Sequence, residues 1–188
     1  MDISERKKQA RKQALIRRKS AHAHGKDVAE QAAAHMLAYV KRTGNPQIIA
    51  AYMPMRTEIS PLPAMVSLHA QGHRICVPVI TAARQALSFQ EWTPQSTMVA
   101  GEFGAAIPRH GEMLTPDLLT VPLLAFNHAG GRLGYGGGFY DRSLAQLRAN
   151  GRALAVGYAY AAQQGEVPIE STDQRLDALV TEQGLIEF

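Results

Sequence analysis

Short apolar runs alternate along the chain with longer stretches that have the residue spacing or composition of helices. The apolar runs predict strands at 47–53, 74–80, 86–92, 118–126, 153–158 and 178–181. Helices are predicted at 4–19, 26–41 and 61–71, and a further helical segment follows the glycine-rich stretch 130–141 and ends near Gly151. Strands that alternate with helices form a mainly parallel sheet covered on both faces. The pattern therefore predicts a three-layer α/β fold with a Rossmann-like open sheet.

The loops at one edge of such a sheet are the expected place for a ligand. Right-handed crossovers put the loops after Met53, Phe126 and Tyr158 on the same edge, where ligands of open α/β sheets gather. The first of these loops carries Glu58, which could answer the dipole of the next helix or face the donor groups of a ligand. The sequence leaves both interpretations of Glu58 open.

The composition suits one compact domain, 1–188. With 188 residues, 46% of them hydrophobic, the chain is long enough for a full core, and no repeat or linker divides it. The lone Cys76 excludes an internal disulfide. The first residues lack the apolar segment of a secretory signal, and no apolar stretch is long enough to cross a membrane. We expect a soluble cytoplasmic protein and a monomer.

The positive charge is concentrated near the N-terminus. A net charge of +4 and a pI of about 9.4 fit either nucleic acid or a polyanionic small ligand. The predicted first helix, capped by Ser4, carries Lys7, Arg11 and Arg18 on one face, because a helix has about 3.6 residues per turn. Like charges stacked in this way repel unless an anion lies against them. The face is therefore either a solvated basic surface or part of a polyanion site.

A glycine-rich stretch at 130–141 is the strongest candidate for an anion site. It follows the apolar run 118–126 and opens onto a predicted helix. Glycines leave backbone N–H groups uncovered, and the positive end of the helix dipole favours an anion such as phosphate. The alternative is a flexible surface loop, although a plain linker would not need arginine, tyrosine and aspartate at such close spacing.

This stretch is neither of the two common phosphate fingerprints. A Walker A loop ends in Gly-Lys-Ser/Thr, but Gly138 is followed by Phe139, and the dinucleotide fingerprint fails at the same position. One cysteine and scattered histidines do not make a zinc site. Asp141 and Asp173 offer the hard oxygen ligands that suit Mg²⁺ on phosphates, but each could equally be a helix cap or a surface charge. Trp92, at a strand end, is either a rim plug or a stacking platform for a flat ligand.

The segment R-L-G-Y-G-G-G-F-Y-D-R, residues 132–142, resembles the signature of the 5-formyltetrahydrofolate cyclo-ligase family, also called 5,10-methenyltetrahydrofolate synthetases. The basic helix with Lys7 and Arg11, the loop with Glu58 and the late Asp173 match that family in the same order. The resemblance covers the whole chain, and its glycine-rich motif is the specific part.

The resemblance implies an enzyme that uses ATP and Mg²⁺. Members of the family convert 5-formyltetrahydrofolate to 5,10-methenyltetrahydrofolate with release of ADP and phosphate, through a phosphorylated formyl group. Phosphorylation turns a poor leaving group into a good one, so the protein mainly positions the reactants and neutralises charge. Two positions depart from the family pattern: Phe139 replaces the usual tyrosine, and Thr172 stands where a histidine often precedes the late aspartate.

The resemblance also implies roles for individual residues. The expected catalytic residues are Arg132, Tyr135 and Tyr140. The expected ATP contacts are Lys7, Arg11, Arg132, Leu133, Gly134, Tyr135, Gly136, Gly137, Gly138, Phe139 and Tyr140. The expected folate contacts are Met53, Glu58, Tyr135, Gly136, Gly137, Gly138 and Phe139. Asp141 and Asp173 are expected to hold Mg²⁺.

Two other classes of function remain open at this point. A nucleic-acid-binding module would use the basic helix, but only 6% of the residues are aromatic and no RNA-binding motif is present. A sugar-phosphate or coenzyme A-type enzyme would use the glycine-rich loop but leave Lys7 and Arg11 without a role. The resemblance favours small-molecule substrates, with neither nucleic acid nor a membrane as a partner.

Overall fold

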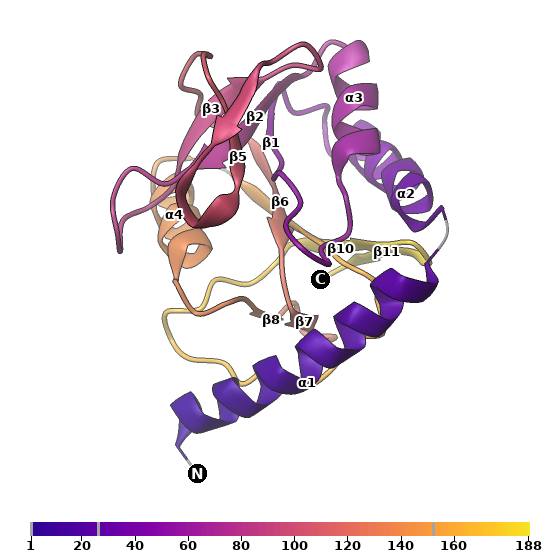
Figure 1. The fold of residues 1–188 in the computed structure, drawn as a ribbon, viewed down its shortest axis with the longest axis vertical. Coiled ribbons are helices and arrows are strands. Elements are labelled where there is room, and N and C mark those ends of the chain that lie inside the picture. The colour runs from indigo at the N-terminus through magenta and orange to yellow at the C-terminus, as the bar shows by residue number, and fades with distance from the viewer. Residues whose placement is uncertain (1, 26, 152) are drawn as a thin grey trace.

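The computed structural model describes residues 2–25, 27–151 and 153–188 (Figure 1). Within these ranges, seven strands form one sheet in the order β11-β10-β9-β6-β1-β2-β3. The strands of this sheet are β1 (Ile48–Ala50), β2 (Arg74–Val79), β3 (Ser88–Trp92), β6 (Leu118–Pro122), β9 (Leu154–Tyr158), β10 (Ala178–Thr181) and β11 (Gly184–Glu187). The five from β10 to β2 are parallel neighbours, and β3 and β11 close the two edges in antiparallel pairs.

Alternate residues of the parallel strands face opposite sides of the sheet and build two separate cores. Ile49 packs in the cluster that contains residues of α2 (Val28–Arg42) and α3 (Leu62–Ala70), whereas its neighbour Ala50 packs in the cluster that contains Leu144 of α4 (Phe139–Ala149). Figure 1 shows α2 and α3 on one side of the sheet and α4 on the other. The predicted three-layer, mainly parallel α/β fold is therefore confirmed.

Helix α1 (Ile3–His24) lies across the edge of the sheet where the parallel strands end (Figure 1). Its Ala10 and Ala14 pack on Leu124 and Leu133, which belong to the segment that continues beyond β6. The predicted cap at Ser4 is wrong: Asp2 is the N-cap, and its carboxylate accepts a hydrogen bond from the Glu5 N–H at 2.8 Å. The helix also runs further than 4–19, because no glycine or proline stops it before Gly25.

The apolar run 118–126 is not one strand. The chain leaves the sheet after β6, and β7 (Ala125–Phe126) then pairs antiparallel with β8 (Arg132–Leu133). The side-chain amide of Gln163, in the 3₁₀ turn η2 (Ala161–Gln163), donates to the Leu123 and Leu124 carbonyls at 2.7 and 3.1 Å. This buried amide satisfies backbone groups that a continuous ladder would otherwise pair, so the strand can break there. The β7–β8 hairpin therefore separates β6 from the glycine-rich loop.

The region 98–113 contains regular structure as well as loops. A second antiparallel hairpin, β4 (Met98–Ala100) with β5 (Ala106–Pro108), encloses the 3₁₀ turn η1 (Glu102–Gly104). Trp92 is only 6% exposed and packs in the core that contains α2 and α3. It pairs with Ile75, near the start of β2, so it lies away from the edge where the parallel strands end. The interpretation of Trp92 as a stacking platform is wrong.

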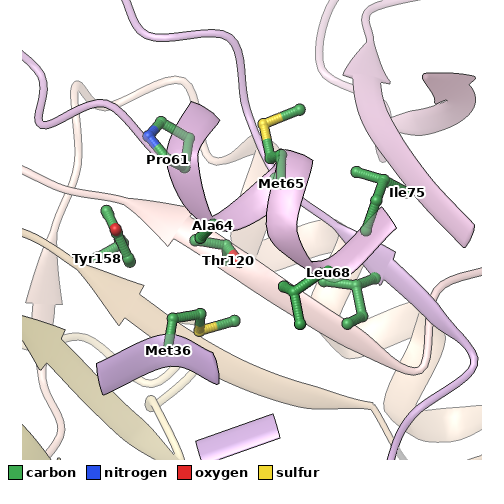
Figure 2. A pocket seen from close by; sticks show the side chains of 10 residues that line it. Met36, Pro61, Ala64, Met65, Leu68, Ile75, Thr120 and Tyr158 are labelled. Atoms are coloured by element: carbon green, nitrogen blue, oxygen red, sulfur yellow. The ribbon is translucent and has the colours of Figure 1, made fainter. Parts of the chain in front are cut away.

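A small cavity lies between the sheet and the two helices α2 and α3 (Figure 2). Its volume is about 10 Å³, which is roughly what a single water molecule needs. Thr120 and Tyr158 line it together with apolar side chains such as Met36 and Leu68. The cavity is too small for a nucleotide. Within the described residues, no helix is both long enough and apolar enough to cross a membrane.

Candidate functional site

Three segments that are distant in sequence meet beside α1. Arg11 of α1 donates from Nε to the Gly134 carbonyl of the glycine-rich loop at 2.9 Å. Arg18, two turns further along, donates to Thr57 Oγ1 in the loop between β1 and α3 at 3.1 Å, and to Tyr135 Oη at 2.6 Å. The structure thus brings together the basic helix, the Glu58 loop and the glycine-rich loop.

The basic face of α1 is turned into the protein. Lys7 is 9% exposed and Arg18 only 1%. The interpretation of this face as a solvated surface is therefore wrong, and a nucleic-acid module could use only the cations that remain exposed on this helix, such as Lys8, Lys12 and Lys19. The exposed Lys8, in contrast, lies 3.7 Å from Glu5 on its own helix.

The glycine-rich loop has free donors and fixed carbonyls. Gly136 and Gly138 have φ values of 99° and 66°, which non-glycine residues rarely adopt. Arg142 donates to the Gly137 carbonyl at 2.6 Å, as Arg11 does to that of Gly134. Within the part of the chain that the structure describes, the backbone N–H groups of residues 134–138 have no hydrogen-bond partner. The loop then enters the N-terminus of α4, so both the donors and the dipole fit a phosphate group.

The residues predicted to bind phosphate are paired with those predicted to hold Mg²⁺. Lys7 Nζ lies 2.7 Å from Asp173 and 3.1 Å from Glu170. Arg132 Nη2 lies 2.6 Å from Asp141, whose same oxygen accepts from the Gln174 N–H at 2.9 Å. These two clusters lie on either side of the segment 170–174 and tie it to α1 and to the start of α4.

The carboxylates alone do not form a metal cage. Among the described residues, no group of three or more His, Cys, Asp or Glu side chains could hold a metal ion. Mg²⁺ commonly binds through one or two carboxylates together with phosphate oxygens and water. Asp141 and Asp173 fit that mode, in which the phosphates of a nucleotide supply further ligands.

The environment of Lys7 keeps its ammonium group charged. Burial alone would lower its pKa, but the hydrogen bonds to Asp173 and Glu170 outweigh that effect and raise the pKa. A permanently charged ammonium group at this position suits a phosphate contact.

Glu58 is a buried carboxylate with few partners. Its side chain is 4% exposed, and it accepts from the Met55 N–H at 2.9 Å and from Tyr135 Oη at 3.3 Å. Burial raises the pKa of Glu58, although the Met55 N–H and the Arg18 guanidinium, 3.7 Å away, act in the opposite direction. A favourable interaction with the dipole of α3 does not fully explain the position of Glu58. Its carboxylate also lies against Arg18 and Tyr135.

The two tyrosines predicted to be catalytic remain neutral. Burial raises the pKa of Tyr135 and of Tyr140, and the nearby charge of Glu58 acts in the same direction. Both hydroxyls therefore suit the donation of a hydrogen bond and not the acceptance of a proton. Tyr135 is 46% exposed and can reach a ligand, whereas Tyr140 packs against the core under α4.

The remaining predicted contacts differ in how they can face a ligand. Met53 is half-buried beside the α2–α3 core. Leu133 is 2% exposed and packs on α1, so only its backbone can approach a ligand. Phe139 lies under Arg142, whose guanidinium carbon is 5.3 Å from the ring centre.

Three residues of this region, Thr57, Glu170 and Gln174, were assigned no role by the sequence, and Arg18 was placed only on the basic face of the first helix. Arg18 and Thr57 join α1 to the Glu58 loop, and Glu170 and Gln174 support Lys7 and Asp141. The spacing of Arg18 from Lys7 and Arg11 was the available signal, but it could not show that this face points inward. The other three residues give no signal, because their contacts arise only when the segments meet in three dimensions.

Known proteins match this chain in both sequence and fold. A family model described as the 5-formyltetrahydrofolate cyclo-ligase family matches residues 3–182. The chain belongs to this family. The matched residues include α1 and the glycine-rich loop, which are the two segments in which the sequence most resembles this family.

Individual cyclo-ligases are similar over most of their length. The chain is 32% identical to 5-formyltetrahydrofolate cyclo-ligase of Escherichia coli strain K12 over 162 residues, which cover 82% of this chain and 88% of that one. It is 37% identical to the Haemophilus influenzae cyclo-ligase over 140 residues, covering 70% and 74%. The NMR structure of Aquifex aeolicus 5,10-methenyltetrahydrofolate synthetase has a TM-score of 0.77 at 26% identity and covers 96% of this chain and 92% of its own. The chain thus shares both sequence and fold with this family of enzymes.

The burial of Glu58 leads to a prediction about the pH dependence of stability. Because burial raises its pKa above the ordinary 4.5, the folded protein binds this proton more tightly than the unfolded chain does. The ionised carboxylate therefore costs stability, and this cost is absent below pH 4.5 and complete above the raised pKa. We expect the free energy of unfolding of Glu58→Gln, relative to the wild type, to rise as the pH increases through that window.

Urea unfolding of the two proteins at a series of pH values measures this difference. A constant offset would reflect packing or hydrogen bonding, and only the slope with pH reports the titration of Glu58. A relative stability of Glu58→Gln that falls with rising pH would contradict the assigned direction.

Proposed function

We propose that the protein catalyses the ATP- and Mg²⁺-dependent cyclisation of 5-formyltetrahydrofolate to 5,10-methenyltetrahydrofolate, with release of ADP and phosphate. The observation that supports this most is the position of the glycine-rich loop. Among the described residues its N–H groups have no hydrogen-bond partner, Arg11 of α1 donates to its Gly134 carbonyl, and its Tyr135 donates to the buried carboxylate of Glu58. The site would thus have one end, at the glycine-rich loop, that suits a phosphate group, and another, at Glu58, that suits a hydrogen-bond donor of the substrate.

At the phosphate end, the residues bind and neutralise charge. The N–H groups of residues 134–138 and the N-terminus of α4 would accept the phosphate oxygens of ATP, with Lys7 and Arg11 alongside. Asp141 and Asp173 would hold Mg²⁺, which lowers the repulsion between the phosphates and the attacking oxygen when bound. Arg132 holds Asp141 in place, and its charge offsets that of the carboxylate.

At the folate end, the residues orient the substrate. Glu58 as a carboxylate would accept hydrogen bonds from the N–H groups of the pterin, and the half-buried Met53 would pack on the ring. Tyr135, which is 46% exposed, would contact the substrate next to the loop with its ring, because its hydroxyl already donates to Glu58 and accepts from Arg18. The formyl oxygen would then face the terminal phosphate of ATP, which converts this oxygen into a leaving group before N10 attacks the carbon.

Binding of the nucleotide would require little rearrangement of the ion pairs that are already present. Lys7 already lies beside Asp173, and Arg132 beside Asp141. A nucleotide phosphate and its metal ion would bind next to each of these ion pairs, so that positive and negative charges alternate. No unpaired charge would have to cross an apolar region. This pre-arrangement reduces the reorganisation that accompanies phosphoryl transfer.

One assay tests the proposed function. The protein is mixed with 5-formyltetrahydrofolate, ATP and Mg²⁺, and the near-ultraviolet absorbance of the methenyl product is followed. Product should form only when all three are present. Absence of an ATP-dependent signal at high enzyme concentration would overturn the proposal.

Lys7→Ala should chiefly raise the Michaelis constant for ATP. Loss of a charged hydrogen bond to phosphate weakens binding by roughly 1.5–3 kcal/mol, or about tenfold to a hundredfold. Lys8→Ala is the matched control, because Lys8 lies on the outer side of the same helix and is exposed. Steady-state kinetics with each substrate varied in turn measures the effect. A change confined to the Michaelis constant for folate would show that Lys7 belongs to the other end of the site.

Asp141→Asn should lower turnover by orders of magnitude, because an amide binds Mg²⁺ more weakly than a carboxylate does. The same change weakens the ion pair with Arg132, so the thermal unfolding midpoint is measured alongside the activity. A partial rescue by raised Mg²⁺ concentration is expected. Near-normal turnover at low Mg²⁺ would instead leave Asp141 with a purely structural role beside Arg132.

A further inference from the structure

Arg18 is a fully buried cation whose contacts all lead to residues of the candidate site. Its side chain is 1% exposed, although arginine is rarely buried without a specific partner. Nε donates to Thr57 Oγ1 and Nη2 to Tyr135 Oη, and the guanidinium carbon lies 5.4 Å from the centre of the Tyr135 ring. Nη1 has no hydrogen-bond partner among the described residues and lies 3.7 Å from Glu58 Oε1.

We propose that Arg18 is a positioning residue for the folate end of the site, where it holds Glu58 as a carboxylate and fixes the hydroxyl of Tyr135. The inference rests on the proposed function, since it assigns Glu58 and Tyr135 to the folate. It adds a residue that reaches the substrate only through these two side chains. It also gives α1 a second task beyond the nucleotide contacts of Lys7 and Arg11.

The energetics argue against a purely structural role for Arg18. A buried ion pair is weak support for stability, because the loss of hydration is large and apolar replacements are often neutral or better. The Arg18–Glu58 pair is also long, at 3.7 Å, so it lacks the close contact that offsets this cost best. A cation that is buried, incompletely bonded and placed against two ligand-facing residues is better explained by the site it serves.

The charge of Arg18 bears directly on Glu58. The charged and titratable groups that face Glu58 come from several elements: Arg18 of α1, Tyr52 after β1, Arg56 in the same loop, Tyr135 of the glycine-rich loop and Tyr140 of α4. Of these, only the two arginines are cations, and Arg56 is exposed to solvent whereas Arg18 is buried. Solvent screens an exposed charge, so Arg18 is the stronger influence on the carboxylate.

Tyr135 is held by the same guanidinium. Its hydroxyl accepts a hydrogen bond from Arg18 at 2.6 Å and donates one to Glu58 at 3.3 Å, so the hydroxyl hydrogen points towards Glu58. Without Arg18 the tyrosine, which is 46% exposed, could turn towards solvent. Glu58 and Tyr135 would then both lose their orientation. Loss of Arg18 would therefore affect the folate end of the site, unlike loss of a residue that contacts the nucleotide.

The test compares Arg18→Met, which removes the charge, Arg18→Lys, which keeps it, and Lys19→Met as a control on the exposed side of the same helix. Calorimetry with 5-formyltetrahydrofolate and, separately, with a non-hydrolysable ATP analogue and Mg²⁺ gives both dissociation constants at pH 6, 7.5 and 9. We expect Arg18→Met to weaken folate binding at least tenfold at pH 6, with nucleotide binding changed less than threefold. The folate deficit should shrink towards pH 9, because loss of the cation raises the pKa of Glu58 and higher pH restores its carboxylate.

Arg18→Lys should recover much of the folate affinity, and Lys19→Met should match the wild type. An equal loss of folate and nucleotide affinity, or a folate deficit that does not change with pH, would overturn the role of Arg18. If Arg18→Met does not fold, Thr57→Val replaces it: this variant removes the acceptor of Arg18 Nε, and it should weaken folate binding alone. A wild-type protein that neither binds the folate nor forms product would overturn the proposed function itself, whereas normal wild-type behaviour with the wrong variant pattern overturns only the inference.

Discussion

The inner face of α1 carries positive charges into the protein, and each of them has to be matched by an acceptor. Lys7 meets Asp173 and Glu170, Arg11 meets the carbonyl of Gly134, and Arg18 meets Thr57, Tyr135 and Glu58. These acceptors come from loops that follow different strands, so one helix fixes the relative positions of all of them. Without this helix the loops would share an edge of the sheet but no common partner.

The sheet explains why a single helix suffices. Because β1, β6 and β9 are parallel neighbours, the chain leaves each of them at the same edge. The small side chains Ala10 and Ala14 let α1 approach the β7–β8 hairpin closely, which brings its longer cations within reach of the loops. Apolar and polar contacts therefore alternate along one face of α1. The apolar contacts set how closely the helix approaches the loops, and this distance decides which acceptors its cations can reach.

Much of this arrangement was predictable, and the exceptions have physical causes. Apolar runs located the strands, and the sheet order put the Glu58 loop near the glycine-rich loop, because strand burial follows local hydrophobicity. Periodicity alone showed that Lys7, Arg11 and Arg18 share a face, but not that this face is buried. That depends on acceptors such as Glu170 and Thr57, which lie more than thirty positions away in the sequence. The break after β6 depends likewise on the amide of Gln163, about forty residues further on.

The departure at Phe139 shows which properties of the glycine-rich loop the fold requires. The ring supports the guanidinium of Arg142, and Arg142 in turn holds the Gly137 carbonyl at 2.6 Å. This support needs an aromatic face and not a hydroxyl, so phenylalanine fulfils it. The carbonyls of Gly134 and Gly137 are thus both fixed by arginines, one from α1 and one from α4, and the N–H groups between them have no hydrogen-bond partner among the described residues. The geometry of the candidate anion site is therefore set by the backbone and two guanidinium groups, and neither of them requires a hydroxyl at position 139.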